Sequence, residues 1–226
     1  MATTATAPFT DELWGSIGGI YDRILSHPFL VELVEGTLDE QAFQHYIIQD
    51  TLYIREYARV HSIAAGRAEA SNDMLRFSQL ASEIVHAEQT FHADFFRDWG
   101  LSDEDVWMTV PAPTNLAYTS YMLAVAYSGT FAESVGAVLP CSWIYLKVGK
   151  KLAETGSASP LYQRWIDLYA GDEYEAMIQD VLAIANRLGA SADDRERERV
   201  TRHFITGARF EWMFWDMGYR REQWPV

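Results

Sequence analysis

Apolar and aromatic residues recur at three- and four-residue steps along most of the chain. Between residues 39 and 67 this series consists of Phe43, Tyr46, Ile47, Tyr53, Ile54, Tyr57, Val60 and Ile63. Such spacing places the side chains on one face of an amphipathic helix. The same pattern predicts helices over residues 72–99, 115–128, 130–154, 161–188 and 193–219. No segment alternates with period two, so the sequence predicts no sheet.

Short turn-forming stretches rich in Gly, Pro and Ser separate these periodic segments. The chain has no internal repeat, low-complexity tract or long linker that would divide it. We therefore expect one all-α domain over residues 1–226, a helical bundle of about seven or eight helices, with residues 1–10 as a flexible tail. Ligand sites in bundles lie between facing helices, so functional groups are sought among polar residues on apolar stripes.

Composition and charge narrow the classes of function. The net charge is −14, from 32 acidic and 18 basic residues, which argues against binding to nucleic acid or anionic lipid. No stretch approaches the roughly 20 apolar residues of a membrane span, and residues 1–8 lack the features of a secretion signal. A single Cys excludes an internal disulfide and fits a reducing, cytoplasmic location.

Cys141 follows a proline inside an otherwise helical run. Pro140 should bend the helix and free a backbone carbonyl about one turn earlier, which opens space in a bundle. Tyr145 lies four residues further on and shares the face of Cys141. A helix start created by the bend would favour the thiolate form of a nucleophile. The competing interpretation is a small buried hydrophobic residue.

Two carboxylates, Glu211 and Asp50, lie among aromatic residues, in surroundings from which a hydrophobic core normally excludes charged side chains. Glu211 lies among Phe210, Trp212, Phe214 and Trp215. Burial would raise its pKa towards neutrality, as a general acid and base requires. An exposed Glu211 on the opposite helical face is the alternative.

Asp50 belongs to a stripe that it shares with three tyrosines, Tyr46, Tyr53 and Tyr57. Here a carboxylate can accept hydrogen bonds from an aminopyrimidine edge while a ring stacks nearby. The alternative is an Asp50 satisfied by tyrosine hydroxyls as part of the structure. Tyr118 follows a loop with two prolines, and Tyr169 precedes an expected helix break at Gly171. These two are weaker candidates, since such tyrosines are often packing residues.

A metal site receives little support. Glu83 and His86 have the Glu-x-x-His spacing of di-iron bundles, and His92 lies four residues after Glu88. A di-iron site needs a second Glu-x-x-His, which the chain lacks. Solvated polar positions are the simpler interpretation, and we expect neither metal nor cofactor.

Five sequence segments together resemble the TenA/thiaminase II proteins, in that family's order and near its spacing. They are residues 27–29, 49–50, 118–120, 139–145 and 211–219. The Pro-Cys-x-Trp-x-Tyr segment at 140–145 and the Glu-x-x-Phe-Trp segment at 211–215 are the most specific. The resemblance extends from about residue 13 to residue 224.

The resemblance implies a haem-oxygenase-like all-α fold and a homotetramer. It also implies hydrolysis of 4-amino-5-aminomethyl-2-methylpyrimidine, or of thiamin, to 4-amino-5-hydroxymethyl-2-methylpyrimidine. Within it, Cys141 corresponds to the nucleophile, Glu211 to the acid and base, and Asp50 to the carboxylate that binds the pyrimidine. The remaining candidates correspond to aromatic residues that pack on the ring or position it, and these are Tyr53, Tyr118, Tyr145 and Tyr169.

Two positions depart from the family pattern: Phe210 stands where Tyr is frequent, and Ala170 where Gly is frequent. Cys141 excludes the branch that lacks the central cysteine. Two other functions stay open at this point. One is a carrier that holds the pyrimidine without cleaving it. The other is a haem or di-iron oxidoreductase that uses His27 or the Glu83 and His86 pair.

Overall fold

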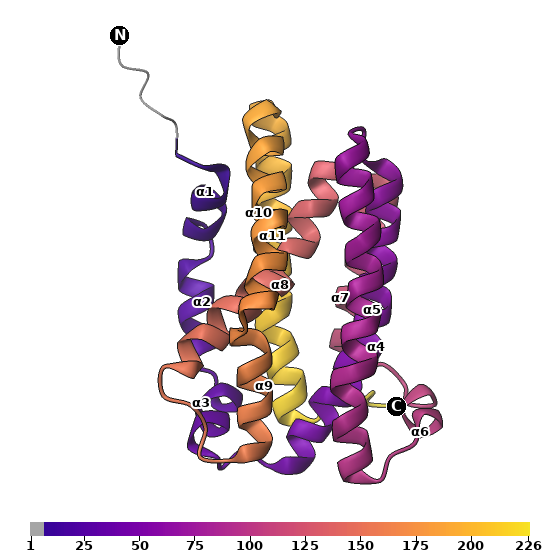
Figure 1. Ribbon diagram of the computed structural model, residues 1–226, viewed down its shortest axis with the longest axis vertical. Coiled ribbons are helices and arrows are strands. Elements are labelled where there is room, and N and C mark those ends of the chain that lie inside the picture. The colour runs from indigo at the N-terminus through magenta and orange to yellow at the C-terminus, as the bar shows by residue number, and fades with distance from the viewer. Residues whose placement is uncertain (1–6) are drawn as a thin grey trace.

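The computed structural model describes residues 7–226, apart from the side chains of residues 87–91 and 103. This part of the chain contains α-helices and no strand, which confirms the all-α prediction (Figure 1). The helices are α1 (Phe9–Gly15), α2 (Gly18–Leu25), α3 (Pro28–Glu35), α4 (Glu40–Arg67), α5 (Ser71–Trp99), α6 (Asp103–Trp107), α7 (Pro113–Ser128), α8 (Phe131–Ala153), α9 (Pro160–Ala170), α10 (Asp172–Ser191) and α11 (Asp194–Arg220).

The described residues thus form eleven helices, more than the seven or eight expected. Helices α1, α2, α3 and α6 have five to eight residues, too few for the apolar pattern to repeat. The segment 161–188 is two helices, because the extended backbone of Gly171 (φ −66°, ψ 149°) separates α9 from α10. The expected tail is also too long: α1 begins at Phe9, and Phe9 and Thr10 are buried, while residues 1–6 lie outside the described part.

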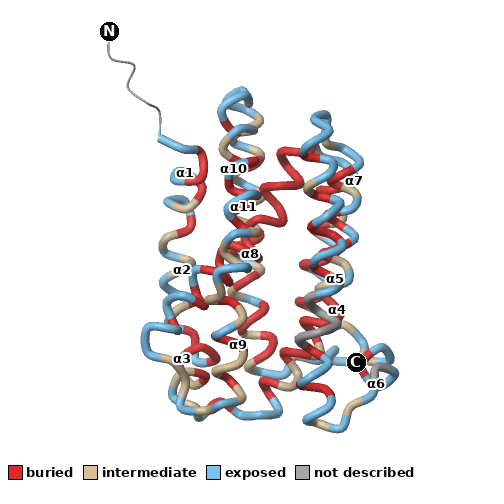
Figure 2. Tube along the Cα trace, in the orientation of Figure 1, coloured by how far each residue is buried: buried red, intermediate tan, exposed pale blue. Residues whose placement is uncertain are grey.

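Helix α8 lies at the centre of the bundle and contacts α4, α7, α9, α10 and α11. It crosses obliquely between the upright helices in Figure 1. From Phe131 to Leu146 nearly every residue of α8 is buried, as its colour in Figure 2 shows. A helix that is apolar on all sides belongs in the interior, and this one is surrounded by a single hydrophobic cluster.

A glycine allows α11 to approach α8 closely. A Cβ atom at Gly207 would lie 2.7 Å from Cγ of Pro140. The proline ring therefore packs directly on the backbone of α11 beside Cys141. Glu211 lies one turn further along α11, so this contact brings Glu211 to the same level of the bundle as the cysteine. No helix in the described part of the chain is long and apolar enough to cross a membrane.

Candidate active site

The seven candidate residues come from five helices and converge in the interior of the bundle. They are Asp50 and Tyr53 on α4, Tyr118 on α7, Cys141 and Tyr145 on α8, Tyr169 on α9, and Glu211 on α11. Six of them are buried, whereas Cys141 keeps partial exposure to solvent. The structure therefore brings these seven residues together, and Cys141 is the one among them that is not classed as buried.

Glu211 is buried, with 2 % of its surface exposed, as the first interpretation of the sequence required. Its pKa is raised from 4.5 to about 8, first by burial and also by the nearby charge of Asp50. The hydrogen bond from Tyr118 and the neighbouring Cys141 thiol act in the opposite direction and limit this rise in pKa. A carboxyl group with such a pKa can both accept and release a proton near neutral pH.

Cys141 is not activated in the way the sequence suggested. Helix α8 runs unbroken through Pro140, so no new helix start lies at the thiol. Burial raises the pKa of Cys141 well above 9, and the charge of Glu211 raises it further. The nearby hydroxyl groups of Tyr53 and Tyr57 partly oppose this rise in pKa. The resting side chain is therefore a thiol beside a carboxyl group that can take its proton.

Tyr118 orients Glu211. Its hydroxyl donates a hydrogen bond of 2.6 Å to Oε1 of Glu211. The Tyr118 ring stacks on Phe210, with centroids 4.9 Å apart and planes inclined by 9°. Phe210, where the family often has Tyr, thus supports the tyrosine that bonds the glutamate. On its other side Tyr118 contacts the ring of Tyr53 at 5.2 Å.

The hydroxyl of Tyr145 is engaged within the protein. It shares a hydrogen bond of 2.7 Å with the hydroxyl of Tyr46, one turn before Asp50 on α4. The Tyr145 ring lies 4.8 Å from that of Tyr169 and 4.9 Å from that of Trp215. Tyr145 and Tyr169 therefore form an aromatic wall near Asp50. Burial raises the pKa of both hydroxyls, and the charge of Asp50 contributes to the rise.

Asp50 contacts a residue that the sequence interpretation did not place in the site. Its Oδ2 lies 3.2 Å from Nε2 of His92 on α5. His92 entered the sequence argument only as a possible metal ligand with Glu88, whose side chain is outside the described residues. No local motif marks the contact, because it joins two residues that are 42 positions apart in sequence and lie on different helices. Tyr57 was also missed, although its place on the Asp50 stripe was a signal.

A buried amide network fixes α7 against α4. Gln49 accepts hydrogen bonds from the amide N–H of Ala112 (2.8 Å) and from Nδ2 of Asn115 (2.9 Å) through Oε1. Its own Nε2 donates to the carbonyl of Val110 at 3.1 Å. The loop that leads into α7 is thereby fastened to the residue before Asp50, which sets the position of Tyr118 relative to the carboxylate.

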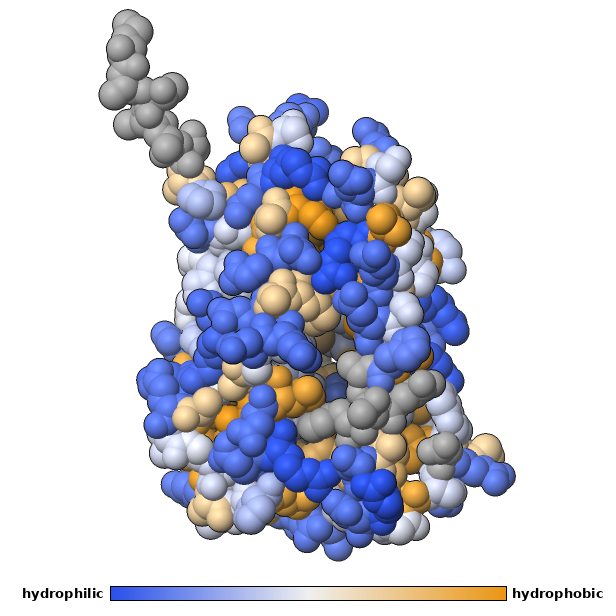
Figure 3. Space-filling model, in the orientation of Figure 1, coloured by the Kyte–Doolittle hydropathy of each residue, from blue (hydrophilic) through white to orange (hydrophobic). Residues whose placement is uncertain are grey.

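Tyr174 borders this interior on the side of α10. Tyr174, near the start of α10, is half-buried and donates a hydrogen bond of 3.2 Å to the carbonyl of Ser142, the residue after Cys141. The Tyr174 ring also meets Tyr169 edge to face at 5.2 Å. The surface is hollowed between α10 and α5 on the face shown in Figure 3. Tyr174 is a further member of the site that the sequence did not reveal.

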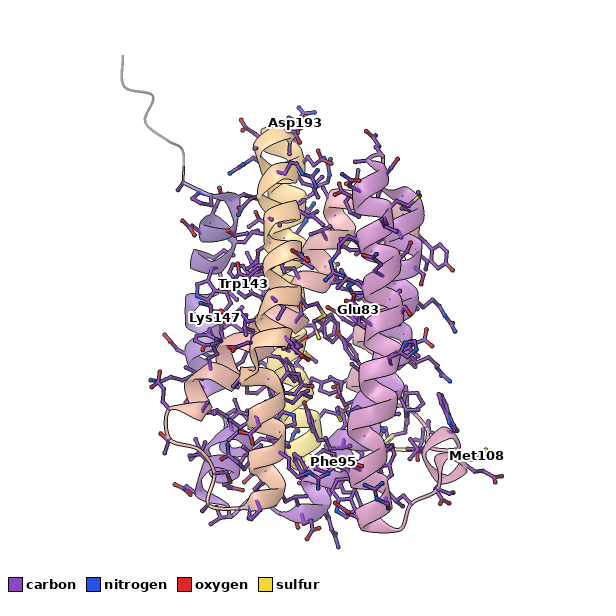
Figure 4. All side chains as sticks on the ribbon, in the orientation of Figure 1. Glu83, Phe95, Met108, Trp143, Lys147 and Asp193 are labelled. Atoms are coloured by element: carbon purple, nitrogen blue, oxygen red, sulfur yellow. The ribbon has the colours of Figure 1, made fainter. Side chains whose placement is uncertain are left out.

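The proposed metal ligands have other partners. Glu83, on the side of α5 that faces α10 in Figure 4, accepts hydrogen bonds from Arg76, which also pairs with Asp180 on α10. His27 caps α3 and lies 3.7 Å from Asp216. Among the described residues no three His, Cys, Asp or Glu side chains are grouped to hold a metal ion.

The chain is similar to proteins of known name along nearly its whole length. The chain is 31 % identical to the aminopyrimidine aminohydrolase of Bacillus subtilis (strain 168), over 96 % of this chain and 92 % of that one. It is 33 % identical to the aminopyrimidine aminohydrolase of Halalkalibacterium halodurans, over 96 % and 97 % of the two chains.

Solved structures show the same fold. A TenA homologue from P. horikoshii OT3 superposes with a TM-score of 0.87 at 30 % identity, covering 95 % of this chain and 99 % of that one. A domain with a heme oxygenase-like fold from Shewanella denitrificans OS217 gives a TM-score of 0.76 at 14 % identity, covering 94 % and 92 %, and confirms the expected fold class. The sequence profile described as the TENA/THI-4/PQQC family matches residues 14–221. The chain belongs to the TENA/THI-4/PQQC family.

Proposed function

We propose that this chain is a hydrolase of thiamin salvage or degradation. Its substrate is 4-amino-5-aminomethyl-2-methylpyrimidine, thiamin, or both, and its product is 4-amino-5-hydroxymethyl-2-methylpyrimidine. The names of the Bacillus and Halalkalibacterium relatives support this activity. The observation that carries the proposal is the buried Glu211 carboxyl group, with a pKa of about 8, close enough to the Cys141 thiol for each group to shift the pKa of the other.

The pair of Cys141 and Glu211 accounts for each proton in the reaction with the aminomethyl substrate. The sulfur adds to the pyrimidine ring while its proton passes to the Glu211 carboxylate. Glu211 then gives this proton to the departing amine as the bond between the methylene carbon and nitrogen breaks. Water adds to the methylene carbon and loses a proton to Glu211, which returns it to sulfur as the carbon–sulfur bond breaks. One water is consumed, and thiol and carboxylate are regenerated.

The other site residues bind and orient the ring in this scheme. Asp50 accepts a hydrogen bond from the 4-amino group and stabilises positive charge that gathers on the ring. Tyr53 and Tyr118 present aromatic faces beside Cys141, against which a flat pyrimidine packs. Tyr145 and Tyr169 close the wall next to Asp50 and limit the positions that the ring can take.

The test is to incubate the purified protein with each ligand and follow hydroxymethylpyrimidine by mass spectrometry. Wild type should form product, and Cys141→Ser should lose more than about a thousandfold in rate, since a serine hydroxyl is far harder to ionise. Thermal melting checks that the variant is folded. Uncleaved ligand bound to folded wild-type protein would instead indicate a carrier. The ratio of the two wild-type rates distinguishes the salvage amine from thiamin.

We further propose that residues 1–226 act as a single domain, in a cytoplasmic homotetramer. The reduced state that Cys141 needs supports the cytoplasm. Large apolar side chains that are exposed on the single chain support an interface between subunits. Trp107, Met108 and Val110 are exposed near α6, and Trp224 is exposed where its indole N–H donates to the carbonyl of Pro111. Light scattering coupled to gel filtration should give four times the chain mass, and a monomer mass would contradict this.

A further inference from the structure

The contact between Asp50 and His92 is buried and belongs to no motif. Nε2 of His92 lies 3.2 Å from Oδ2 of Asp50, and the two residues are 3 % and 4 % exposed. The other ring nitrogen, Nδ1, lies 2.8 Å from Oγ1 of Thr51, the residue after Asp50. One imidazole from α5 therefore spans two consecutive residues of α4.

The tautomer of His92 sets the direction of the bond to Asp50. The Thr51 hydroxyl has one proton and two neighbouring acceptors, the carbonyl of Ile47 at 3.1 Å and Nδ1 of His92. If Thr51 donates to His92, neutral His92 carries its proton on Nε2. In that tautomer Nε2–H faces Oδ2 of Asp50 at 3.2 Å, the distance at which it can donate to the carboxylate.

We propose that His92 is a positioning residue that holds the Asp50 carboxylate in one orientation, with Oδ2 occupied and Oδ1 directed to the amino group of the pyrimidine. The inference rests on the proposed function. A carboxylate rotates easily about its terminal torsion, so an untethered Asp50 would present its oxygens over a broad range of angles. Fixing one oxygen defines where the amino group, and hence the ring, must lie relative to Cys141.

The position of His92 is itself fixed. Thr51 holds Nδ1, and the ring of Phe96, one turn further along α5, lies 6.1 Å from the imidazole. Helix α5 thus takes part in the site through His92 even though its residues supply none of the proposed chemistry. Because α4 and α5 are antiparallel neighbours with extensive contact, the distance between Asp50 and His92 is set by the packing of two long helices.

Three substitutions separate the contact of His92 with Asp50 from its contact with Thr51. In His92→Gln the amide Nε2 takes the place of the ring Nε2 and reaches Asp50, while no atom replaces Nδ1. In His92→Asn the shorter amide reaches Thr51 but falls short of Asp50. His92→Phe keeps the ring and loses both bonds. We expect Gln to retain binding of hydroxymethylpyrimidine and turnover of the aminomethyl substrate, whereas Asn and Phe weaken binding by about 10- to 100-fold and raise KM in parallel.

A spectroscopic measurement tests the tether without catalysis. In protein with ¹⁵N-labelled histidine, the Nε2–H proton of His92 should exchange slowly with water and give a resolved downfield signal. It should disappear in His92→Gln and persist in His27→Gln. His27 is the matched control, because it is 4 % exposed and lies near Asp216, but it caps α3 outside the site. His27→Gln should leave pyrimidine binding within about twofold of wild type.

The outcomes separate this inference from the proposed function. Weaker binding in Asn and Phe, recovery in Gln and the protected proton support the inference. They do so even if wild type binds hydroxymethylpyrimidine and hydrolyses neither ligand, a result that would remove only the proposed function. Two results would overturn the role of His92 and leave the proposed hydrolase intact. One is pyrimidine binding in all three variants equal to that of wild type, and the other is the absence of a protected His92 proton in wild-type protein that hydrolyses the substrate.

Discussion

The Tyr118 hydroxyl donates a hydrogen bond of 2.6 Å to Glu211, and this bond lowers a pKa that burial raises. The two effects are unequal, since the pKa of Glu211 still reaches about 8. Tyr118 thus stabilises the carboxylate form, the form that takes the thiol proton in the proposed reaction. The same contact joins α7 to α11 across the site.

The rate should therefore depend on pH through Glu211. Below pH 8 the free enzyme carries a protonated Glu211, so kcat/KM should fall as the pH decreases from about 8. Tyr118→Phe removes the bond that favours the carboxylate, and the pKa should rise. The midpoint of the profile should move to higher pH, with kcat lower by about tenfold at pH 7.5. Product formation between pH 6 and 10 gives both quantities.

Tyr121 supplies the control for this substitution. It lies one turn further along α7, and its hydroxyl bonds Nδ1 of His203 rather than Glu211. Tyr121→Phe should leave the midpoint of the pH profile where it is in wild type. Identical profiles for Tyr118→Phe and wild type would show that the hydrogen bond has no influence on the group that titrates.

The raised pKa of Glu211 should also make the stability of the protein depend on pH. Its pKa is about 8 when folded and 4.5 when exposed, so the folded state binds a proton that the unfolded state releases between these values. The free energy of unfolding should therefore fall as pH rises from 4.5 to 8. Glu211→Gln lacks this loss, and between pH 5 and 8 it should gain about 3 kcal/mol relative to wild type.

Urea unfolding at several pH values measures this difference. The change with pH is the informative quantity, because any constant effect of the Gln amide cancels. Parallel stability curves for wild type and Glu211→Gln would mean that Glu211 has an ordinary pKa in the folded protein. The proposed acid and base role would then lose its physical basis.

The sequence predicted the long helices well and the short ones poorly, for a reason of length. Over residues 40–67 and 71–99 the apolar repeat passes through seven or more turns, whereas α3 completes about two. Pro28 and Gly36 do mark the ends of α3, through an N-terminal proline and a left-handed C-cap with φ 74°. The break at Gly171 was visible, but the apolar pattern of 161–188 passes across it.

The site was predictable where a charged residue lies on the apolar face of its helix. Glu211 and Asp50 are carboxylates on apolar stripes, and both are buried. Properties set between helices could not be deduced in this way. The raised pKa of Cys141 depends on burial under neighbouring helices, and the partnership of Asp50 with His92 depends on how α4 meets α5.

The amide network around Gln49 should be essential for stability. Gln49→Leu leaves the buried N–H of Ala112 without its acceptor, whereas the amide of Asn115 loses one acceptor and keeps the backbone carbonyl of residue 49 at 2.7 Å. An unsatisfied buried group costs about 1–3 kcal/mol, so we expect a loss of that size in urea unfolding. Gln41→Leu, at an exposed position of the same helix, should change stability by less than about 0.5 kcal/mol. Equal stability of the two variants would contradict the network.

Gly149 determines how closely α9 packs on α8, and through it the position of Tyr169. A Cβ atom at Gly149 would lie 2.6 Å from the carbonyl carbon and 2.7 Å from Cβ of Tyr169. These are backbone and near-backbone atoms that cannot rotate away, so α9 must shift. Gly149→Ala should cost about 1–3 kcal/mol of stability and raise KM for the pyrimidine, because the wall beside Asp50 moves.

Gly66 offers the matched comparison for Gly149. It lies in the exposed last turns of α4, and a Cβ atom there would meet nothing within 4 Å. Gly66→Ala should stabilise the protein by about 0.5–1 kcal/mol, because alanine loses less conformational freedom in a helix. The measurements are the midpoints of urea unfolding for both variants and the KM of Gly149→Ala, each compared with wild type. If Gly149→Ala gained stability as Gly66→Ala does, α8 and α9 could not be in the close contact that holds Tyr169 in the site.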